Sequence, residues 1–259
     1  MVKIFEIIGK NVIRFFEETG RMLLLFLKIF YWMFKKPSEW KSITQQMTII
    51  GVKSFIVITI TSLSTGMILA LQTGAALERK ISGSALFLGG IVSLSLVREL
   101  APVLTGLVMA GKIGSAIAAE LGTMNVTEQI DALDTMATNP VKYLAVPRFL
   151  ACIFMLPALT IYANLLGILG GLFISTNVFD VSINTFLEGM TSYLTADDIY
   201  KGLLKTVFFG AIISTVGCHK GFETSGGAEG VGKATTSSVV ISSMLILIAD
   251  YMLTAFLWV

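Results

Sequence analysis

The sequence predicts an all-α protein that crosses a membrane several times. Of the 259 residues, 54% are hydrophobic and only 14% are charged, whereas soluble domains carry about 25% charged residues. The hydrophobic residues gather in several runs as long as a bilayer-crossing helix, which needs about 20 residues. The formal net charge of +2 gives no sign of a nucleic-acid partner. We expect one domain over residues 1–259.

The first 42 residues are expected to form an amphipathic helix region at the membrane surface. Charged residues recur every three or four positions between Lys3 and Arg21, opposite an apolar face. The following run from Met22 to Phe34 is apolar, but it is shorter than a span and is interrupted by Lys28. A tilted first span is the alternative. These charges leave no continuous apolar segment of the kind found in a cleavable signal peptide.

Five longer apolar runs are predicted to span the membrane, at 47–73, 84–110, 143–175, 199–218 and 235–259. The third run exceeds a minimal span and contains Pro147 and Pro157, so we expect it to be bent or tilted. Small residues allow membrane helices to approach closely. The candidates for such contacts are Gly111, Gly114, Gly167, Gly170 and Gly171.

The distribution of basic residues predicts how the chain is oriented. Eight Lys and Arg residues precede the first long run, and the connections at 111–142 and 219–234 carry others. The connections on the opposite side carry only Arg79, Lys80 and Lys201. Basic residues concentrate on the cytoplasmic side of membrane proteins. The N-terminus is therefore expected in the cytoplasm, and five spans place Val259 outside.

Four charged residues fall inside the predicted spans. Arg98 and Glu99 lie in the second run, Lys205 in the fourth and Asp250 in the fifth. A charge at the bilayer centre costs roughly 2.5–3.5 kcal/mol, so these residues should face protein or water and pair with opposite charges. They form either a polar cluster that recognises a headgroup or holds a gate, or a set of structural ion pairs. Pro102 favours the first interpretation, because a proline can open the helix locally.

The 111–142 connection is predicted to contain a short acidic amphipathic helix at about 125–137. Asn125 is expected to cap it, with Glu128 as the reciprocal partner, and Asn139-Pro140 is expected to end it. Such a helix either docks into a partner or rests on the surface of its own chain.

No catalytic, cofactor or metal-binding pattern is found in the sequence. Residues 227–234 nearly match the phosphate-binding loop, but Ala234 replaces the hydroxyl that binds Mg²⁺, so we expect a flexible cytoplasmic loop there. Cys152 and Cys218 are isolated and are expected to pack within spans. His219 is the only histidine and is expected in a solvated loop. The chain is therefore not expected to be an enzyme.

The stretch from Ser95 to Arg148 closely resembles the MlaE/YrbE family of ABC permeases. It contains the pattern LxRELxPV, then AGxxGSAxxAExGxM, then EQxxxxxxM, then PxxxxxxPR. The resemblance reaches back through Thr65-Gly66-Met67 and Leu71-Gln72, and forward through Lys205 to Asp250 and Leu253-Thr254-Ala255. It covers most of the chain from about residue 45.

The resemblance implies a permease subunit that binds no cofactor and hydrolyses no nucleotide itself. Family members work as homodimers in the inner membrane of double-membraned bacteria, with two copies of a separate ATPase on the cytoplasmic side. They join a periplasmic MCE-domain protein, often with a small STAS-domain subunit. They move phospholipids or related lipids between the inner and outer membranes. We therefore expect an outward-facing cavity between two copies, lined mainly by the first, second and fifth spans.

The resemblance also assigns roles to particular residues. The helix at about 125–137 resembles the coupling helix that engages the ATPase, and the coupling residues would be Glu120, Glu128, Asp131 and Met136. The lipid-binding residues would be Leu69, Gln72, Arg98 and Leu100, and the family's intramembrane charges would be Arg98, Glu99, Lys205 and Asp250. The chemistry of the residues leaves two other classes open. One is a secondary transporter that uses the charges as an ion or proton relay, and the other is a membrane scaffold.

Overall fold

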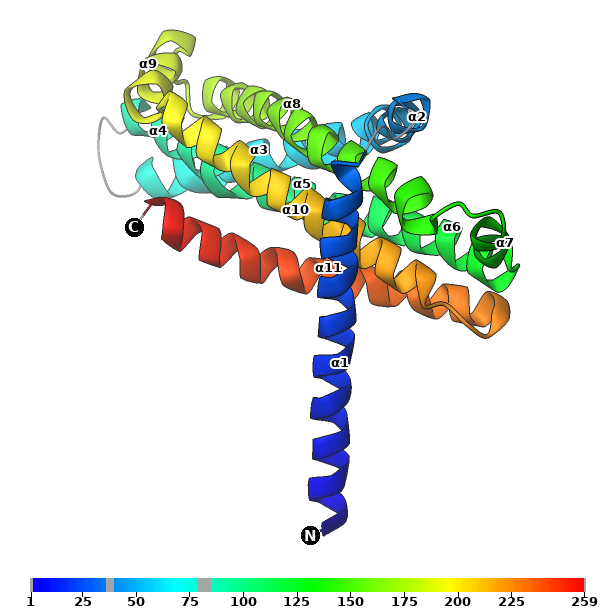
Figure 1. Ribbon diagram of the computed structural model, residues 1–259. Helices are drawn as coiled ribbons and strands as arrows, with labels where there is room; N and C mark the ends of the chain where they lie inside the picture. The colour runs from blue at the N-terminus through cyan, green and yellow to red at the C-terminus, as the bar shows by residue number, and fades with distance from the viewer. Residues whose placement is uncertain (1, 36–39, 79–84, 259) are drawn as a thin grey trace.

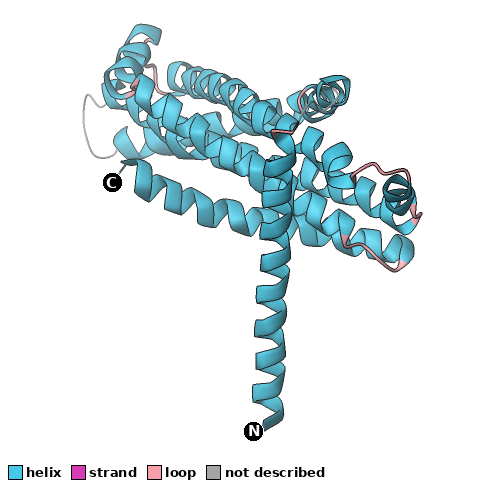
Figure 2. Ribbon diagram, viewed as in Figure 1, coloured by secondary structure: helices cyan, strands magenta, loops and turns pink. Residues whose placement is uncertain are grey.

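The computed structural model describes residues 2–35, 40–78 and 85–258, and within these ranges it is helical without any strand (Figure 2). For residues 2–8, 10, 11, 14, 15, 85 and 86 the structure describes the backbone but not the side chains. The predicted all-α class is confirmed. Arg79 and Lys80, which entered the orientation argument, lie outside the described residues.

Five helical stretches are long and apolar enough to cross a membrane. They are Trp40–Glu78, Phe87–Val126, Val141–Val178, Ala196–Phe222 and Gly227–Trp258. Each contains or largely overlaps one of the five predicted runs, so the predicted number of spans is confirmed. The second stretch continues 16 residues beyond its predicted end at residue 110. Hydropathy marks where the chain leaves an apolar environment, whereas a helix continues as long as its backbone hydrogen bonds do.

The N-terminal segment forms a single helix, α1 (Val2–Met33), which crosses the bundle instead of running along it (Figure 1). It packs against α10, α8 and the turn before α8. Ile29 is fully buried there, and the Phe26 ring meets the Phe149 ring edge-on at 6.0 Å between centroids. The crosswise position fits the predicted interfacial helix. The side chains of Lys3, Lys10 and Arg14, on the predicted charged face, lie outside the described residues.

The remaining helices form one bundle (Figure 1). Their bounds are α2 Trp40–Ile50, α3 Phe55–Glu78, α4 Ala85–Ser95, α5 Ala101–Met109, α6 Ser115–Val126, α7 Gln129–Thr135, α8 Val146–Val178, α9 Ile183–Tyr193, α10 Ala196–Phe222 and α11 Gly227–Trp258. The central helix is α10, which packs against α8, α6 and α11, while α3 lies along α8 and α4 packs on α9. The short helices α7 and α9 lie at opposite ends of the bundle (Figure 1).

Glycines bring α3 and α8 into close contact. A Cβ atom on Gly66 would lie 1.9 Å from the carbonyl oxygen of Gly167, and one on Gly170 would lie 2.5 Å from that of Leu63. The prediction of close packing at 167–171 is therefore confirmed. The prediction for Gly111 is wrong for the described part of the chain, because none of its atoms lies within 4 Å of a Cβ placed there. Gly114 makes only ordinary contacts.

Three π-helical turns interrupt the long helices: η2 (Leu96–Leu100), η3 (Ala110–Gly114) and η4 (Val141–Ala145). The first ends two residues before Pro102, and the third ends two residues before Pro147. A proline has no N–H, and its ring clashes with the carbonyl four residues earlier. A wider turn at that point relieves the clash. Pro147 thus lies at the start of α8, whereas α8 continues through Pro157.

Two loop predictions near the end of α10 are wrong. Residues 227–234 form the first turns of α11, because Gly226 and Gly227, with φ of 87° and 67°, reverse the chain within a few residues. His219 is only 3% exposed in the last turn of α10, since that turn packs into the bundle instead of leaving it. Cys152 and Cys218 are buried free thiols inside helices, as predicted.

Candidate functional site

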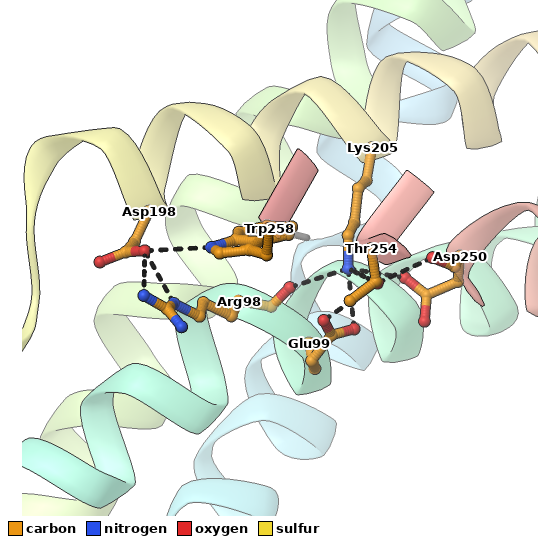
Figure 3. A network of polar contacts seen from close by, with 7 residues as sticks. All are labelled: Arg98, Glu99, Asp198, Lys205, Asp250, Thr254 and Trp258. Atoms are coloured by element: carbon orange, nitrogen blue, oxygen red, sulfur yellow. Dashed lines mark hydrogen bonds and ion pairs between the residues drawn. The ribbon is translucent and has the colours of Figure 1, made fainter. Parts of the chain in front are cut away.

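The charged residues inside the spans form one network at the junction of η2, α10 and α11 (Figure 3). Arg98 occupies one side of it. Its Nη2 and Nε atoms each lie 2.7 Å from Oδ1 of Asp198, whose side chain is 3% exposed. The indole N–H of Trp258 reaches the same oxygen at 3.3 Å. Asp198 therefore holds both the guanidinium group and the end of α11.

The other oxygen of Asp198 is occupied by the start of its own helix. Oδ2 accepts hydrogen bonds from the backbone N–H of Thr195 at 3.0 Å and from its hydroxyl at 2.7 Å. This arrangement is a capping box, which satisfies donors at a helix N-terminus. Both carboxylate oxygens are thus saturated, and the group that begins α10 also fixes Arg98.

Lys205 forms the other side of the network and is fully buried. Its ammonium group donates to Oε2 of Glu99 at 2.8 Å and to the hydroxyl of Thr254 at 2.6 Å, and it lies 3.0 Å from Oδ1 of Asp250. Thr254 also donates toward Oε1 of Glu99 at 3.1 Å. The three helices that carry these groups are therefore tied together by one buried cation.

The π-helical turn supplies the fourth ligand of Lys205. Pro102 lacks the N–H that an α-helix would donate to the carbonyl of Arg98, and the ammonium group of Lys205 donates to that carbonyl at 3.2 Å. Gly202 lets α10 approach this turn, because a Cβ there would lie 2.5 Å from the carbonyl oxygen of Val97. The helix is therefore opened before Pro102, as predicted: the backbone carbonyl of Arg98 accepts a hydrogen bond from the Lys205 side chain instead of from a backbone N–H.

The network contains more acidic than basic side chains. Two cations, Arg98 and Lys205, face three carboxylates, those of Glu99, Asp198 and Asp250. Lys201 lies near Trp258 but pairs with Asp197 at 2.7 Å, so this neighbouring pair is balanced. Glu99 is also the carboxylate of the network with the greatest side-chain exposure, 39%. The structure thus leaves an anionic, half-open group beside a buried cation.

Sequence reasoning found four members of this network and missed Asp198, Thr254 and Trp258. Asp198 lies one residue before the fourth predicted run, 199–218, so it falls outside the charges predicted within the spans. The available signal was Thr195 followed three residues later by an acidic residue, which is typical of a capping box. That spacing could have placed Asp198 inside the helix, but it could not have identified Arg98 as its partner.

The predicted lipid-binding residues are only partly brought together. Leu69 and Leu100 both pack against an apolar core between α3, α4 and α9, formed by Ala70, Leu88, Val92, Leu96, Val181 and Phe186. Arg98 follows this core on η2, with 37% of its side chain exposed. Gln72 is exposed on α3. The structure gives these residues positions, and their contact with lipid stays a prediction.

The predicted coupling helix is shorter than expected and begins differently. It is α7, Gln129–Thr135, and its preceding residue Glu128 has a left-handed φ of 59° and makes no side-chain cap. The predicted capping box is therefore wrong. Asn125 belongs to α6 and donates from Nδ2 to the carbonyl of Thr224 at 2.8 Å, which ties α6 to the end of α10.

The tip that contains α7 is exposed and strained. Glu128 and Asp131 are exposed, and Met136 is 75% exposed immediately after the helix. Glu128 and Ala137 have φ values of 59° and 56°, which non-glycine residues rarely adopt. Glu120 lies apart from this tip, on α6, where it pairs at 2.9 Å with the buried Arg148.

Among the described residues, three side chains of the kinds that bind metal ions lie close together. Ligand atoms of Glu18, His219 and Glu223 lie within 4.8 Å of one another. Both carboxylates already face cations, since Glu18 contacts Lys220 and Glu223 lies 2.8 Å from Arg21. These ion pairs join α1 to the end of α10, and a metal ion would have to displace them.

Comparison with known proteins places the chain in a family. The family model described as Permease MlaE matches residues 43–256. A probable ABC transporter permease protein of Rickettsia prowazekii is 39% identical over 254 residues, covering 98% of this chain and 97% of the relative. One of Synechocystis is 44% identical over 209 residues, covering 81% and 79%.

A further relative carries a more specific name. The intermembrane phospholipid transport system permease protein MlaE of Haemophilus influenzae is 35% identical over 262 aligned residues, covering 100% of this chain and 98% of the relative. The region matched by the family model contains every charged residue of the network, from Arg98 on η2 to Asp250 on α11, whereas Trp258 lies two residues beyond it. The helical fold, the five apolar spans and these matches together show that the chain is a multi-pass membrane protein belonging to the MlaE family of ABC transporter permeases.

Proposed function

We propose that this permease moves phospholipids, or related lipids, between the inner and outer membranes of a bacterium, driven by a separate ATPase. The observation that carries the proposal is the full-length similarity to a relative named as a permease of intermembrane phospholipid transport. The chain itself performs no bond chemistry in this mechanism. It sits in the inner membrane with its N-terminus in the cytoplasm and its C-terminus in the periplasm.

The lipid contacts would combine an apolar wall with the charged network. Leu69 and Leu100 present apolar surface to acyl chains, and the exposed part of Arg98 faces a headgroup phosphate, since a guanidinium fork matches phosphate oxygens. Gln72 adds a polar contact from α3. Lys205, Glu99 and Asp250 would hold η2, α10 and α11 together while the site changes shape.

Two copies would enclose this site. Large apolar side chains are exposed along α3, at Ile56, Ile60 and Ile68, and along α11, at Met244, Ile248 and Tyr251. These helices are the first and fifth spans, which supports a homodimer that contacts lipid through the same faces. A periplasmic MCE-domain protein would receive or deliver the lipid, and a STAS-domain subunit would complete the assembly.

The ATPase would dock on α7. The tip has three properties that suit docking: exposed acidic groups at Glu128 and Asp131, an exposed adaptable side chain at Met136, and a strained backbone at both ends. Glu120 would act from α6, because its ion pair with Arg148 joins α6 to the start of α8. Force applied to α7 would thus reach two spans.

The test is ATP-dependent transfer of a fluorescent phospholipid by the permease reconstituted with its ATPase. The double variant Glu128→Lys/Asp131→Lys should weaken ATPase binding at least about tenfold, because like charges across an interface cost several kcal/mol. Transport should fall with it. The matched control is Glu188→Lys, an exposed acidic residue on α9 at the opposite end of the bundle, which should bind normally.

Two results would contradict the proposal. Normal ATPase binding by the α7 variant would remove the coupling role from this helix. Lipid movement by the permease alone, driven by an ion gradient without any ATPase, would instead favour the secondary transporter that the extra carboxylate of the network allows.

A further inference from the structure

An apolar cavity lies outside the charged network, beneath α1. Its volume is about 490 Å³, and it lies between α1, α10 and α11. Met22 and Phe26 line it from α1, Phe208 and Ile212 from α10, and Ala249 and Leu253 from α11. These α10 and α11 residues belong to membrane-spanning stretches. None of the proposed lipid-binding residues borders this cavity.

A single buried hydroxyl in the wall has no hydrogen-bond partner. Thr215 is 5% exposed, lines the cavity and leaves its Oγ1 unpaired. A helical threonine usually bonds the carbonyl four residues earlier, as Thr160 does with Leu156 at 2.9 Å. At Thr215 that carbonyl belongs to Ala211, and the neighbouring Ser214 hydroxyl donates mainly to Gly210 at 2.8 Å, with a longer contact to Ala211 at 3.1 Å. Threonine adopts two χ1 rotamers in helices. A rotation about χ1 can therefore turn the hydroxyl of Thr215 toward the cavity in place of its methyl group.

The cavity is open to the surrounding membrane and has a polar end. Leu23 and Met252, on its rim, are 59% and 64% exposed. On α10, the turn beyond Thr215 carries Lys220, which pairs with Glu18 of α1. One end of the cavity therefore lies near the Lys220–Glu18 ion pair, and the cavity wall beyond it is lined by apolar side chains such as Phe208 and Leu253. A membrane lipid has the same polarity along its length.

We propose that this cavity binds one acyl chain of a glycerophospholipid, with Thr215 donating a hydrogen bond to its ester carbonyl. The lipid belongs to the leaflet nearer α7 and is distinct from the lipid at the transport site. A partner helix is about 10–12 Å wide with its side chains, so a space of about 490 Å³ admits little more than one turn of it. A single hydrocarbon chain fits, and its van der Waals contacts with the apolar walls replace those with neighbouring lipid chains.

The bound chain would touch the helical turns that carry the charged network. Phe208 lies three residues after Lys205 on α10, while Ala249 and Leu253 are the neighbours of Asp250 and Thr254 on α11. Occupancy would therefore stabilise the contact between α10 and α11. The crosswise helix α1 serves as one wall of the site in addition to lying on the membrane.

The experiment uses the full chain in nanodiscs of phosphatidylethanolamine and phosphatidylglycerol, with a diazirine-bearing acyl chain as the probe. Photolabelled peptides are identified by mass spectrometry. The expected result is enriched labelling of residues 208–216 and 245–253, relative to Leu165 and Phe173, which are 58% and 59% exposed on α8. Filling the cavity with Ala211→Phe should remove the enrichment. The matched control Ala116→Phe, at an exposed position on α6, should keep it.

The isosteric variant Thr215→Val tests the hydrogen bond without changing the volume. It should lower the enrichment about fivefold, the effect of one net hydrogen bond of about 1 kcal/mol. Labelling equal to that of Leu165 and Phe173, or unaffected by both cavity variants, would show ordinary surrounding lipid and overturn the proposal. None of these outcomes depends on transport or on the ATPase.

Discussion

The two sides of the charged network pair a cation inside the membrane-spanning region in different ways. Arg98 and Asp198 form a one-to-one pair in which the cation is 37% exposed and the carboxylate is saturated by donors. Lys205 is fully buried and faces two carboxylates, Glu99 and Asp250, of which Glu99 is 39% exposed. The first side resembles a structural clamp. The second has one carboxylate more than it has cations, so Lys205 has a choice of partner.

This difference indicates which ion pairs of the network can break and re-form. A buried cation without partners is strongly unfavourable, so Lys205 must keep at least one carboxylate. It can release the other, because one partner remains. Arg98 and Asp198 have no such reserve, although the exposure of Arg98 lets water replace part of the lost interaction.

The largest effect is expected for Lys205→Met. The change leaves Glu99 and Asp250 close together without their cation, so the free energy of unfolding should fall by about 3 kcal/mol or more. Denaturation in mixed micelles measures it. Lys201→Met is the matched control on the same helix, since its partner Asp197 is 64% exposed; it should cost below about 1 kcal/mol. Equal losses for both variants would remove the distinction between buried and exposed pairs.

A smaller effect is expected for Asp198→Asn. The amide can still accept from Thr195, but Arg98 loses a charge-assisted hydrogen bond, so the loss should be about 1.5–3 kcal/mol. The neighbouring change Asp197→Asn, at an exposed position, should stay within about 0.5 kcal/mol. Unfolding midpoints of the two variants, compared in the same detergent, check the prediction. A loss for Asp198→Asn as small as that of its neighbour would show that Arg98 does not depend on this partner.

The smallest effect is expected for Glu99→Gln alone. Asp250 remains 3.0 Å from Lys205, so the loss of stability should be below about 1 kcal/mol. Adding Asp250→Asn removes the last carboxylate, and the double variant should exceed the sum of the single losses by at least about 1 kcal/mol. Additive losses in this double-mutant cycle would mean that the two carboxylates do not substitute for each other.

The sequence predicted the class of the molecule because lipid acts on long segments. A span needs about 20 apolar residues whatever surrounds it, so five runs could be recognised without knowing any contact. The charges at Arg98, Glu99, Lys205 and Asp250 stood out for the same reason. The short helix near residue 130 could also be predicted, because its acidic and apolar residues alternate with the helical period.

Tertiary structure decided what these residues contact. Asp198 became the partner of Arg98 only because α10 packs beside η2, a contact between residues 100 positions apart. The hydrogen bond from Asn125 to the carbonyl of Thr224 replaced a predicted cap in the same way. That the chain is a membrane protein with charges inside its spans follows from the amino-acid sequence alone, because hydropathy is a local property. Which charges meet, and where a cavity remains beneath α1, depend on the packing of distant helices, which no local pattern encodes.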